Sequence, residues 1–293
     1  MSQVKLPTIL VTGATGAIGT ELVKNLSAMG LPFRAMVRSL ENAGSLLSVE
    51  GAEVVVGDLN DAESIAGALK GIETAFLLTN SSEQAERLQS NFVDIAARVG
   101  LRHIVKLSQW AAALDSPVRF LRYHAAVEEK IKESGMGFTF LRPNLFMQGL
   151  LGFRDSIISQ GKFFASAGDA RISLIDIRDI AAVAAAALTN NAHEGKTYDL
   201  TGPEALTHQE MAQQISDAVG REISFINVSP EDMRQAVLAV GFSLWQADGL
   251  IEDYAHYSRG EASTVTTSVQ DITGMPARSF RTFARDYSGT FLE

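Results

Sequence analysis

The stretch Ile9-Leu10-Val11-Thr12-Gly13-Ala14-Thr15-Gly16-Ala17-Ile18-Gly19 decides the fold, because a short apolar run meets three spaced glycines and then a helical pattern. A strand, a glycine-rich turn and a helix in this order are typical of a dinucleotide-binding βα unit. Glycine permits the tight turn and a close backbone approach to a pyrophosphate, and the helix N-terminus stabilises the negative charge. The stretch therefore predicts a nucleotide cofactor. Its expected ligands are Gly13, Thr15, Gly16, Ala17 and Ile18.

The end of the next predicted strand indicates which nucleotide is bound. Phe33 to Val37 is an apolar run, and Arg38 follows it about twenty residues after the glycines. An acidic residue here would bind a ribose 2′-hydroxyl and repel a 2′-phosphate, whereas a guanidinium suits a phosphate. Arg38 is either a 2′-phosphate ligand or a solvated arginine at a strand end. We favour the first interpretation, and so NADP(H), with NAD(H) as the alternative cofactor.

The composition limits the class of protein. With 293 residues, 46% of them apolar, the chain is long enough to bury a large core. A net charge of −9 argues against a nucleic-acid partner, because phosphate binding needs a basic face. The absence of cysteine excludes disulfides, a thiolate nucleophile and cysteine-ligated metals. We find neither a signal peptide nor an apolar run of membrane-spanning length, so we expect a cytoplasmic protein without a membrane partner and leave its oligomeric state open.

Apolar runs and helical patterns alternate along most of the chain. This alternation predicts a Rossmann-type α/β fold with a doubly wound parallel sheet and a smaller, mostly helical C-terminal part that binds the substrate. We assign residues 1–145 to the dinucleotide-binding domain, with sheet and helix contributions from about 172–200. Residues 146–171 and 201–293 are assigned to the smaller part.

Short polar patterns predict where helices begin. Ser or Thr followed at the correct spacing by Glu, Gln or Pro is typical of a helix N-terminus. Three such patterns are Ser81 with Gln84, Thr207 with Glu210, and Ser229 with Pro230. Asp179 precedes an alanine-rich helix, and we interpret it as the N-cap rather than as a catalytic carboxylate. We also expect a strand near Ile172.

Polar residues follow several predicted strands, where the ligand of an open parallel sheet lies. The further cofactor-binding candidates at these positions are Asp58, Leu59, Thr79, Asn80, Ser108 and Asn144. Asp58 is expected either to bind an adenine amino group or to cap a turn. Thr79 and Asn80 are expected either to contact the ribose or pyrophosphate or to cap a helix.

The residue pair that most dehydrogenases of this fold use for proton transfer is missing. That pair is Tyr-x-x-x-Lys, in which the ammonium lowers the phenol's pKa, and none of the five tyrosines has a lysine four residues later. His124 shares a helix face with Glu128, and its ordinary pKa near 6.5 suits proton donation at neutral pH. His124 is therefore our candidate catalytic residue, with a structural histidine as the alternative. We interpret Glu128 as solvated or paired with Lys132, and expect no metal site.

These features together resemble the NmrA-like group of atypical short-chain dehydrogenases, and within it the branch of NADPH quinone oxidoreductases and triphenylmethane-dye reductases. The resemblance spans nearly the whole chain. It is carried by Val11 to Gly16, Val37-Arg38, Gly57-Asp58, His124 with Glu128, Phe140 to Pro143, Lys196 to Leu200, Gly260, Thr267, and Gly274 to Phe280.

The resemblance implies an NADPH-dependent oxidoreductase that transfers hydride to a quinone-like or other planar conjugated acceptor. Hydride addition to a quinone gives a phenolate-type anion whose conjugate acid has a pKa of about 10, so water or a histidine is a sufficient proton donor. The apolar walls for such an acceptor are expected from Trp110, Phe146, Met147 and Phe153, whose alternative role is core packing.

Two other functions stay open at this point. The family also contains regulators, so the chain could sense NADP(H) without turnover, and the missing Tyr–Lys pair is compatible with that role. It could also be a tailoring reductase or isomerase with one dedicated biosynthetic substrate. For the oxidoreductase that we favour, the expected partner is a small aromatic or quinone-like substrate.

Overall fold

The glycine-rich turn leads from the first strand into the first helix, as its sequence predicts. The computed structural model describes residues 6–292, in which β1 spans Ile9–Val11 and α1 spans Ala17–Ala28. Gly13 has a φ of +63°, a conformation that L side chains rarely adopt. A Cβ on Gly19 would lie 2.1 Å from the carbonyl oxygen of Gly13. Glycine is therefore required at both positions for the helix to begin directly behind the strand.

Seven strands form the central sheet in the order β3-β2-β1-β4-β5-β6-β8. The strands are β1, β2 (Phe33–Val37), β3 (Ala52–Val56), β4 (Thr74–Leu77), β5 (His103–Leu107), β6 (Gly137–Pro143) and β8 (Lys196–Leu200). The neighbouring pairs from β3 to β6 are parallel. The chain reverses its direction of strand addition at β1, which has β2 on one side and β4 on the other. This order confirms the predicted Rossmann-type sheet.

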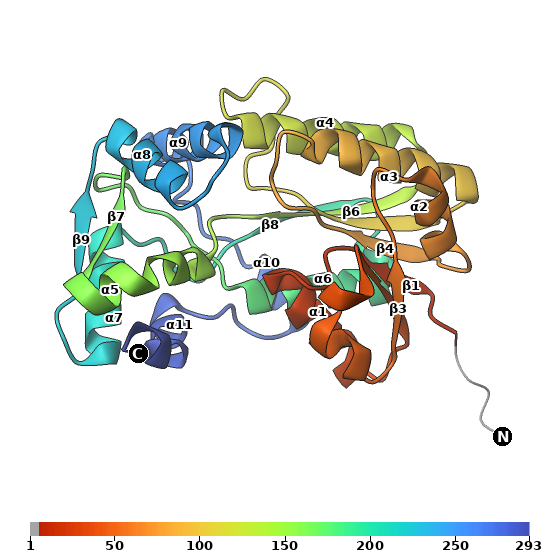
Figure 1. The fold of residues 1–293 in the computed structure, drawn as a ribbon, viewed down its shortest axis with the longest axis horizontal. Helices are drawn as coiled ribbons and strands as arrows, with labels where there is room; N and C mark the ends of the chain where they lie inside the picture. Colours follow the sequence, from red (N-terminus) through yellow and green to blue (C-terminus); the bar gives the residue numbers. More distant parts are fainter. Residues whose placement is uncertain (1–5, 293) are drawn as a thin grey trace. The chain divides into compact units, whose positions relative to one another are not determined.

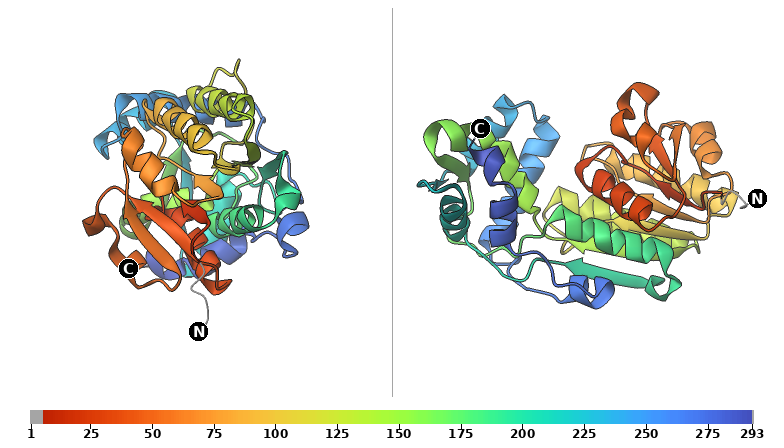
Figure 2. Two further views of the ribbon diagram at one scale, coloured as in Figure 1. Left: turned by 90° about the vertical axis from the view of Figure 1, so that its right-hand side faces the viewer. Right: turned by 90° about the horizontal axis from the view of Figure 1, so that it is seen from below.

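Helices cover both faces of this sheet. Figure 1 shows α2 (Ala62–Leu69), α3 (Ala85–Val99) and α4 (Arg119–Glu133) on one face, and α1 and α6 (Ile177–Thr189) on the other. The right-hand view of Figure 2 shows α1 and α6 in front of the sheet. A fully buried apolar cluster joins the sheet to α2, α3 and α4, and it includes Leu10, Ile65, Phe92, Ile104, Ile131 and Phe140. Burial on both faces explains the apolar runs of the central strands β1 and β4, whose residues are all buried.

The chain forms two compact units. The first contains the chain up to Leu114, Leu121–Arg142 and Ile180–Tyr198, and the second contains Asp115–Phe120, Pro143–Asp179 and the chain from Asp199 onward. Four segments that we expected in the dinucleotide-binding part thus belong to the second unit: residues 115–120, 143–145, 172–179 and 199–200.

The second unit is mostly helical and has a core of its own. Its elements are a 3-10 segment η3 (Met147–Phe153), α5 (Arg154–Gln160), β7 (Lys162–Ala165), α7 (His208–Val219), β9 (Ser224–Asn227), α8 (Pro230–Ala239), α9 (Leu244–Ser258), α10 (Ser268–Thr273) and α11 (Phe280–Asp286). Strands β7 and β9 pair in parallel, a small sheet that the sequence analysis missed. Phe163, Met211, Ile215, Phe280 and Phe283 are buried in the core.

Two of the predicted helix starts are confirmed. Thr207 and Glu210 form a reciprocal capping box at the start of α7. The hydroxyl of Ser229 accepts a hydrogen bond from the N–H of Asp232, with Pro230 at the first helical position of α8. Each cap satisfies N–H groups that have no partner inside the helix.

Three other local predictions are wrong. Helix α3 begins at Ala85 without a side-chain cap, because the hydroxyl of Ser81 instead lies 3.0 Å from the phenol of Tyr123. Near Ile172 there is a single bridge rather than a strand. Asp176 caps α6 in place of Asp179, since its Oδ1 accepts the N–H of the second helical residue at 2.9 Å.

Among the helices of residues 6–292, none has both the length and the apolar content to cross a membrane.

Candidate functional site

The carboxyl ends of the parallel strands bring most of the predicted cofactor ligands to one edge of the sheet. Gly13 follows β1, Arg38 follows β2, Asp58 follows β3, Thr79 and Asn80 follow β4, and Ser108 follows β5. The edge includes the point between β1 and β4 where strand addition reverses, at which open α/β sheets bind ligands. The topology therefore groups residues that are far apart in the sequence.

The turn between β1 and α1 has the form that a pyrophosphate requires. Thr15, Gly16 and Ala17 are exposed, so the first N–H groups of α1 are open to a ligand, whereas Ile18 is buried. The hydroxyl of Thr12 donates to the carbonyl of Phe76 at 3.0 Å and accepts the N–H of Leu78 at 2.9 Å. This pair of bonds fixes the end of β1 against the end of β4. The residues present fit a dinucleotide.

Arg38 is the unpaired cation of this edge. Its side chain is exposed, and it makes no hydrogen bond or ion pair with any described residue. Arg34, on the same strand, differs: its guanidinium donates to the carboxylate of Glu53 and to two backbone carbonyls. Arg34 is thus structural, while Arg38 is available for a phosphate.

The other candidates on this edge have partners within the protein. Oδ1 of Asp58 accepts the backbone N–H of Asn60 at 2.8 Å, which is the turn-capping alternative. Leu59 is half-buried against the apolar cluster. Thr79 accepts a hydrogen bond from the amide of Gln89 at 2.8 Å, and Asn80 is exposed. Neither Thr79 nor Asn80 caps α3, so that alternative is wrong, and their cofactor contacts stay predictions.

His124 lies in a buried cluster of charges that the sequence analysis did not foresee. Lys106 on β5 is fully buried, and its Nζ lies 2.7 Å from His124 Nδ1 and donates to the carbonyl of Leu107 at 3.0 Å. Burial, then the charges of Lys106 and Arg142, hold the pKa of His124 well below its usual value. The expectation that His124 titrates near neutral pH is therefore wrong, and the imidazole is neutral at pH 7.

Lys106 is instead the group of this cluster that titrates near neutral pH. Burial, opposed by the charge of Glu128 and aided by that of Arg142, lowers the pKa of Lys106 to about 7. The signal was present in the sequence: a lysine interrupts the otherwise apolar run Ile104 to Leu107. A charged residue in the middle of a central strand is rarely buried without a partner.

Glu128 is the carboxylate at the centre of the cluster. It is buried, accepts hydrogen bonds from the guanidinium of Arg142 on β6, and also accepts the hydroxyl of Ser108. The predicted partner Lys132 is wrong, because Lys132 pairs with Glu129 at 2.7 Å. Since the hydroxyl of Ser108 already donates to Glu128, Ser108 orients the cluster.

The candidates in the second unit divide into packing and accessible residues. Both donors and the oxygen of the buried Asn144 amide bond to Ser173, Ala262 and Leu145, so Asn144 holds its own loop in place. Met147 is 1% exposed in the core, so its proposed role as a substrate wall is wrong. Phe153 also packs against that core, and Phe146 is half-buried.

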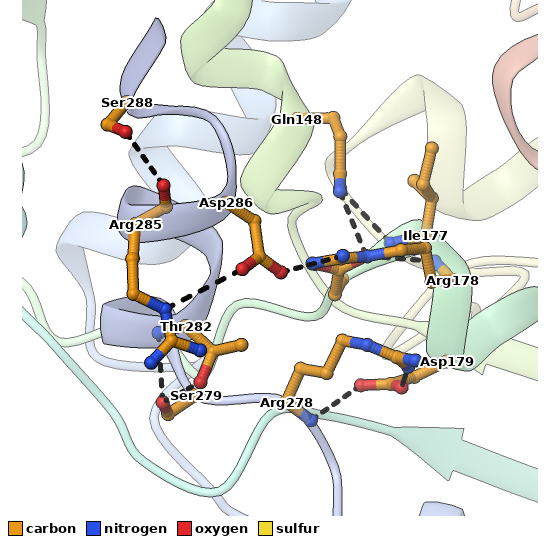
Figure 3. Close-up of polar contacts among 11 residues, drawn as sticks. Gln148, Ile177, Arg178, Asp179, Arg278, Ser279, Thr282, Arg285, Asp286 and Ser288 are labelled. Carbon is orange, nitrogen blue, oxygen red and sulfur yellow. Dashed lines mark hydrogen bonds and ion pairs between the residues drawn. The ribbon is translucent and has the colours of Figure 1, made fainter.

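A second buried cluster of charges anchors η3. Gln148 donates to Asp176 Oδ1 at 2.9 Å and accepts the N–H of Ile177 at 3.1 Å (Figure 3). Arg178 binds Asp176 through Nε and Nη2 and reaches Asp286 on α11 at 2.8 Å. Burial raises the pKa of Asp176, but hydrogen bonds and charge from Arg178 outweigh it and hold the pKa below its usual value. Asp179 accepts the backbone N–H of Arg278 at 2.7 Å.

Comparisons with known proteins agree with this arrangement. The model of the NmrA-like family matches residues 5–273. An NAD(P)H azoreductase of Xenophilus azovorans is 36% identical over 97% of this chain and 99% of its own. An NADPH-dependent quinone oxidoreductase of Escherichia coli, solved with NADPH, has a TM-score of 0.86 at 26% identity and covers 95% of this chain and 99% of its own. A triphenylmethane reductase of Citrobacter sp., solved with NADP(H), has a TM-score of 0.84 at 27% identity, and the match covers 96% of this chain and 99% of its own.

Proposed function

The chain belongs to the NmrA-like family, and from this premise we propose that it is an NADPH-dependent oxidoreductase that reduces a quinone-like or other planar conjugated acceptor. When bound, NADPH supplies the hydride. The chain's own residues hold the cofactor at the sheet edge, orient a flat acceptor and supply a proton where the acceptor needs one. The acceptor class is supported by relatives that reduce azo compounds, quinones and triphenylmethane dyes.

The observation that carries the cofactor assignment is the exposed guanidinium of Arg38. A cation without a partner among the described residues, directly after β2, supports recognition of the 2′-phosphate that distinguishes NADPH from NADH. Gly13, Thr15, Gly16, Ala17 and Ile18 would hold the pyrophosphate, and His124 would lie beside the acceptor. Trp110, Phe146 and Phe153 remain the proposed apolar walls.

Replacing Arg38 tests this assignment. We expect Arg38→Ala to weaken NADPH binding by about 10- to 100-fold, because a hydrogen-bonded charge pair contributes about 1.5–3 kcal/mol, and to leave NADH binding nearly unchanged. Fluorescence titration of both cofactors measures this difference. Arg98→Ala is the matched control, since Arg98 is an exposed arginine in the last turn of α3. An equal loss for both cofactors in Arg38→Ala contradicts 2′-phosphate recognition.

Turnover is tested separately from binding. Oxidation of NADPH by the purified protein is followed with a quinone, an azo compound and a cationic triarylmethane dye as acceptors. We expect turnover that depends on the acceptor and prefers NADPH to NADH. Tight cofactor binding without turnover of any of these acceptors would contradict the reductase and favour a cofactor sensor or a dedicated-substrate enzyme.

A further inference from the structure

Lys106 is placed to interact with one specific nitrogen of His124. Its ammonium is fully buried and has two neighbouring acceptors, the Leu107 carbonyl at 3.0 Å and His124 Nδ1 at 2.7 Å. A charged Lys106 therefore donates to Nδ1, which forces the imidazole proton onto Nε2. The protonation state of Lys106 thus sets the tautomer of His124.

The other nitrogen of the ring stays available. His124 Nε2 makes no hydrogen bond within residues 6–292, yet it is not among the fully buried unpaired nitrogens, so it keeps access to solvent. His124 is 7% exposed, and its ring lies against that of Tyr123 with ring centres 4.1 Å apart and a 32° angle between the planes. His124 therefore has one nitrogen against an internal cation and another that is not fully buried.

The charges around this pair come from three elements. Lys106 lies on β5, Glu128 and His124 lie on α4, and Arg142 lies on β6. Glu128 favours the charged form of Lys106, while burial and Arg142 oppose it. The same cations and the burial keep His124 from becoming an imidazolium. An imidazole that cannot hold a second proton can still pass one on, if it gains a proton at one nitrogen as it loses one at the other.

Resting on the reductase function proposed above, we propose that Lys106 supplies the proton for acceptor reduction through His124. As the reduced acceptor takes the proton from His124 Nε2, Nδ1 takes one from the Lys106 ammonium. The N–H bond of Nε2 and one N–H bond of Lys106 break, and one bond to the acceptor and the N–H bond of Nδ1 form. His124 ends neutral as the other tautomer beside the neutral amine of Lys106. The resting state returns when Nε2 takes a proton from solvent and Nδ1 passes its proton back to the Lys106 amine.

The acceptor decides whether this proton relay, from Lys106 through His124 to the acceptor, is needed. A quinone becomes a hydroquinone by gaining one hydride and one proton. A triarylmethyl cation becomes its neutral leuco form by gaining the hydride alone. The relay therefore affects quinone reduction and leaves dye reduction independent of proton supply, so the dye reports hydride transfer, folding and cofactor binding in the same variant.

The test is Lys106→Met, which keeps the length of the side chain without its proton. We expect the ratio of quinone kcat to dye kcat to fall about 10- to 100-fold. This is the lower end of the usual effect of a general acid, because the hydroquinone anion formed by hydride addition is already fairly stable without its proton. In the unaltered protein, quinone turnover should decrease as pH rises through about 7, the pKa of Lys106, and the variant should lose this decrease. Lys132→Met, an exposed lysine on α4, is the matched control and should change neither quantity.

Two outcomes contradict the relay. One is an equal loss of quinone and dye turnover in Lys106→Met, which indicates a structural lysine. The other is a quinone pH profile that is identical with and without Lys106. If the unaltered protein reduces no acceptor, the proposed function fails instead.

A readout without turnover tests the coupling itself. Nitrogen NMR of labelled histidine, with His124→Gln to assign the signal, distinguishes the two tautomers. We expect His124 to be neutral and protonated on Nε2 at pH 6, and its pKa to rise in Lys106→Met because one neighbouring cation is gone. An unchanged tautomer and pKa in that variant would show that Lys106 does not act on His124.

Discussion

Each compact unit buries a cluster of charged side chains, and the two clusters enclose different cations. In the first unit, the fully buried Lys106 contacts His124, and its pKa is lowered to about 7 by burial despite the charge of Glu128. In the second unit, the fully buried Asp176 binds Arg178 at 2.6 Å. A buried lysine can release its proton near neutral pH, whereas arginine stays charged at any accessible pH. Near neutral pH the first cluster can change its charge, whereas the Asp176–Arg178 pair keeps its charges.

This difference separates a chemical role from a structural one. The Asp176–Arg178 pair joins the start of α6 to Gln148 on η3 and to Asp286 on α11, all by hydrogen bonds that a fixed charge maintains. Lys106 makes few such connections, but it lies against a histidine with a solvent-accessible nitrogen. Burial of charge alone therefore does not identify a reacting group. A titratable cation beside a second titratable group does.

The largest expected effect is on stability, in the second unit. We expect Asp176→Ala to lower the free energy of unfolding by about 3–5 kcal/mol, because it leaves the Arg178 guanidinium without its buried partner and removes the cap of α6. The pKa of Asp176 is held below its usual value, so its contribution is complete above about pH 5 and is lost only as pH falls through that lowered pKa. Urea unfolding between pH 6 and 9 should show a constant loss.

Asp286→Ala is the matched control for that experiment. It removes the other carboxylate from the same arginine, but Asp286 is 32% exposed and Arg178 keeps Asp176, so we expect a loss of about 1 kcal/mol or less. Similar losses in the two variants, or a loss in Asp176→Ala that varies across this pH range, would remove the distinction between the clusters.

The next effect is a pH dependence of stability from the first unit. Lys106 has a pKa of about 7 when folded and an ordinary value of 10.5 when unfolded. Between these values the unfolded chain binds one more proton, so the free energy of unfolding rises with pH by at most about 1.4 kcal/mol per unit. We expect a gain of roughly 2–3 kcal/mol from pH 7.5 to 9.5, measured by urea unfolding below the range of tyrosine ionisation.

Lys106→Met should remove this gain, because methionine binds no proton in either state. Lys132→Met should keep it, since Lys132 is 42% exposed and its ion-pair partner Glu129 is exposed as well. If Lys106→Met retains the full rise, Lys106 is not the group that titrates. The charge of the first cluster would then be as constant near neutral pH as that of the second.

The sequence predicts the first cluster less completely than the fold that carries it. The glycine turn, the parallel sheet and the position of Arg38 follow from local rules: positive φ, alternation of strands and helices, and the carboxyl end of a strand. Glu128 and His124 were found because they share a helix face at four-residue spacing. Their partners Lys106 and Arg142 lie on two neighbouring strands, and only the register of β5 against β6 brings them to that helix.

The second cluster was missed for a related reason. Asp179 has the spacing of an N-cap, but Asp176 takes that place because Arg178 and Gln148 both bind it. Met147 has the composition of a substrate wall, yet it is buried because η3 packs against the core of the second unit. The contact of Gln148 with Asp176 and the packing of η3 against the core both join segments that are distant in the chain, so local spacing alone does not show them.

The smallest expected effect concerns backbone strain beside the first cluster. Ala111 has a φ of +57°, and it is the single non-glycine residue of residues 6–292 with a positive φ, so the described part of the second unit holds no such strain. It lies three residues after Ser108, in a turn closed by the bond from the Ala112 N–H to the Gln109 carbonyl, at the position where a type II turn requires positive φ.

Ala111→Gly should relieve this strain, of about 1–2 kcal/mol, but the more flexible unfolded chain offsets about 0.4–1 kcal/mol of it. We expect a net gain in unfolding free energy of at most about 1.6 kcal/mol, together with a higher KM for the acceptor because Trp110 is held less firmly. Ala112→Gly, at a buried neighbour of ordinary φ, should instead lose stability. Opposite signs for the same substitution at adjacent residues would locate the strain at Ala111, while equal signs would mean that the turn stores none and that the two units do not differ in this respect.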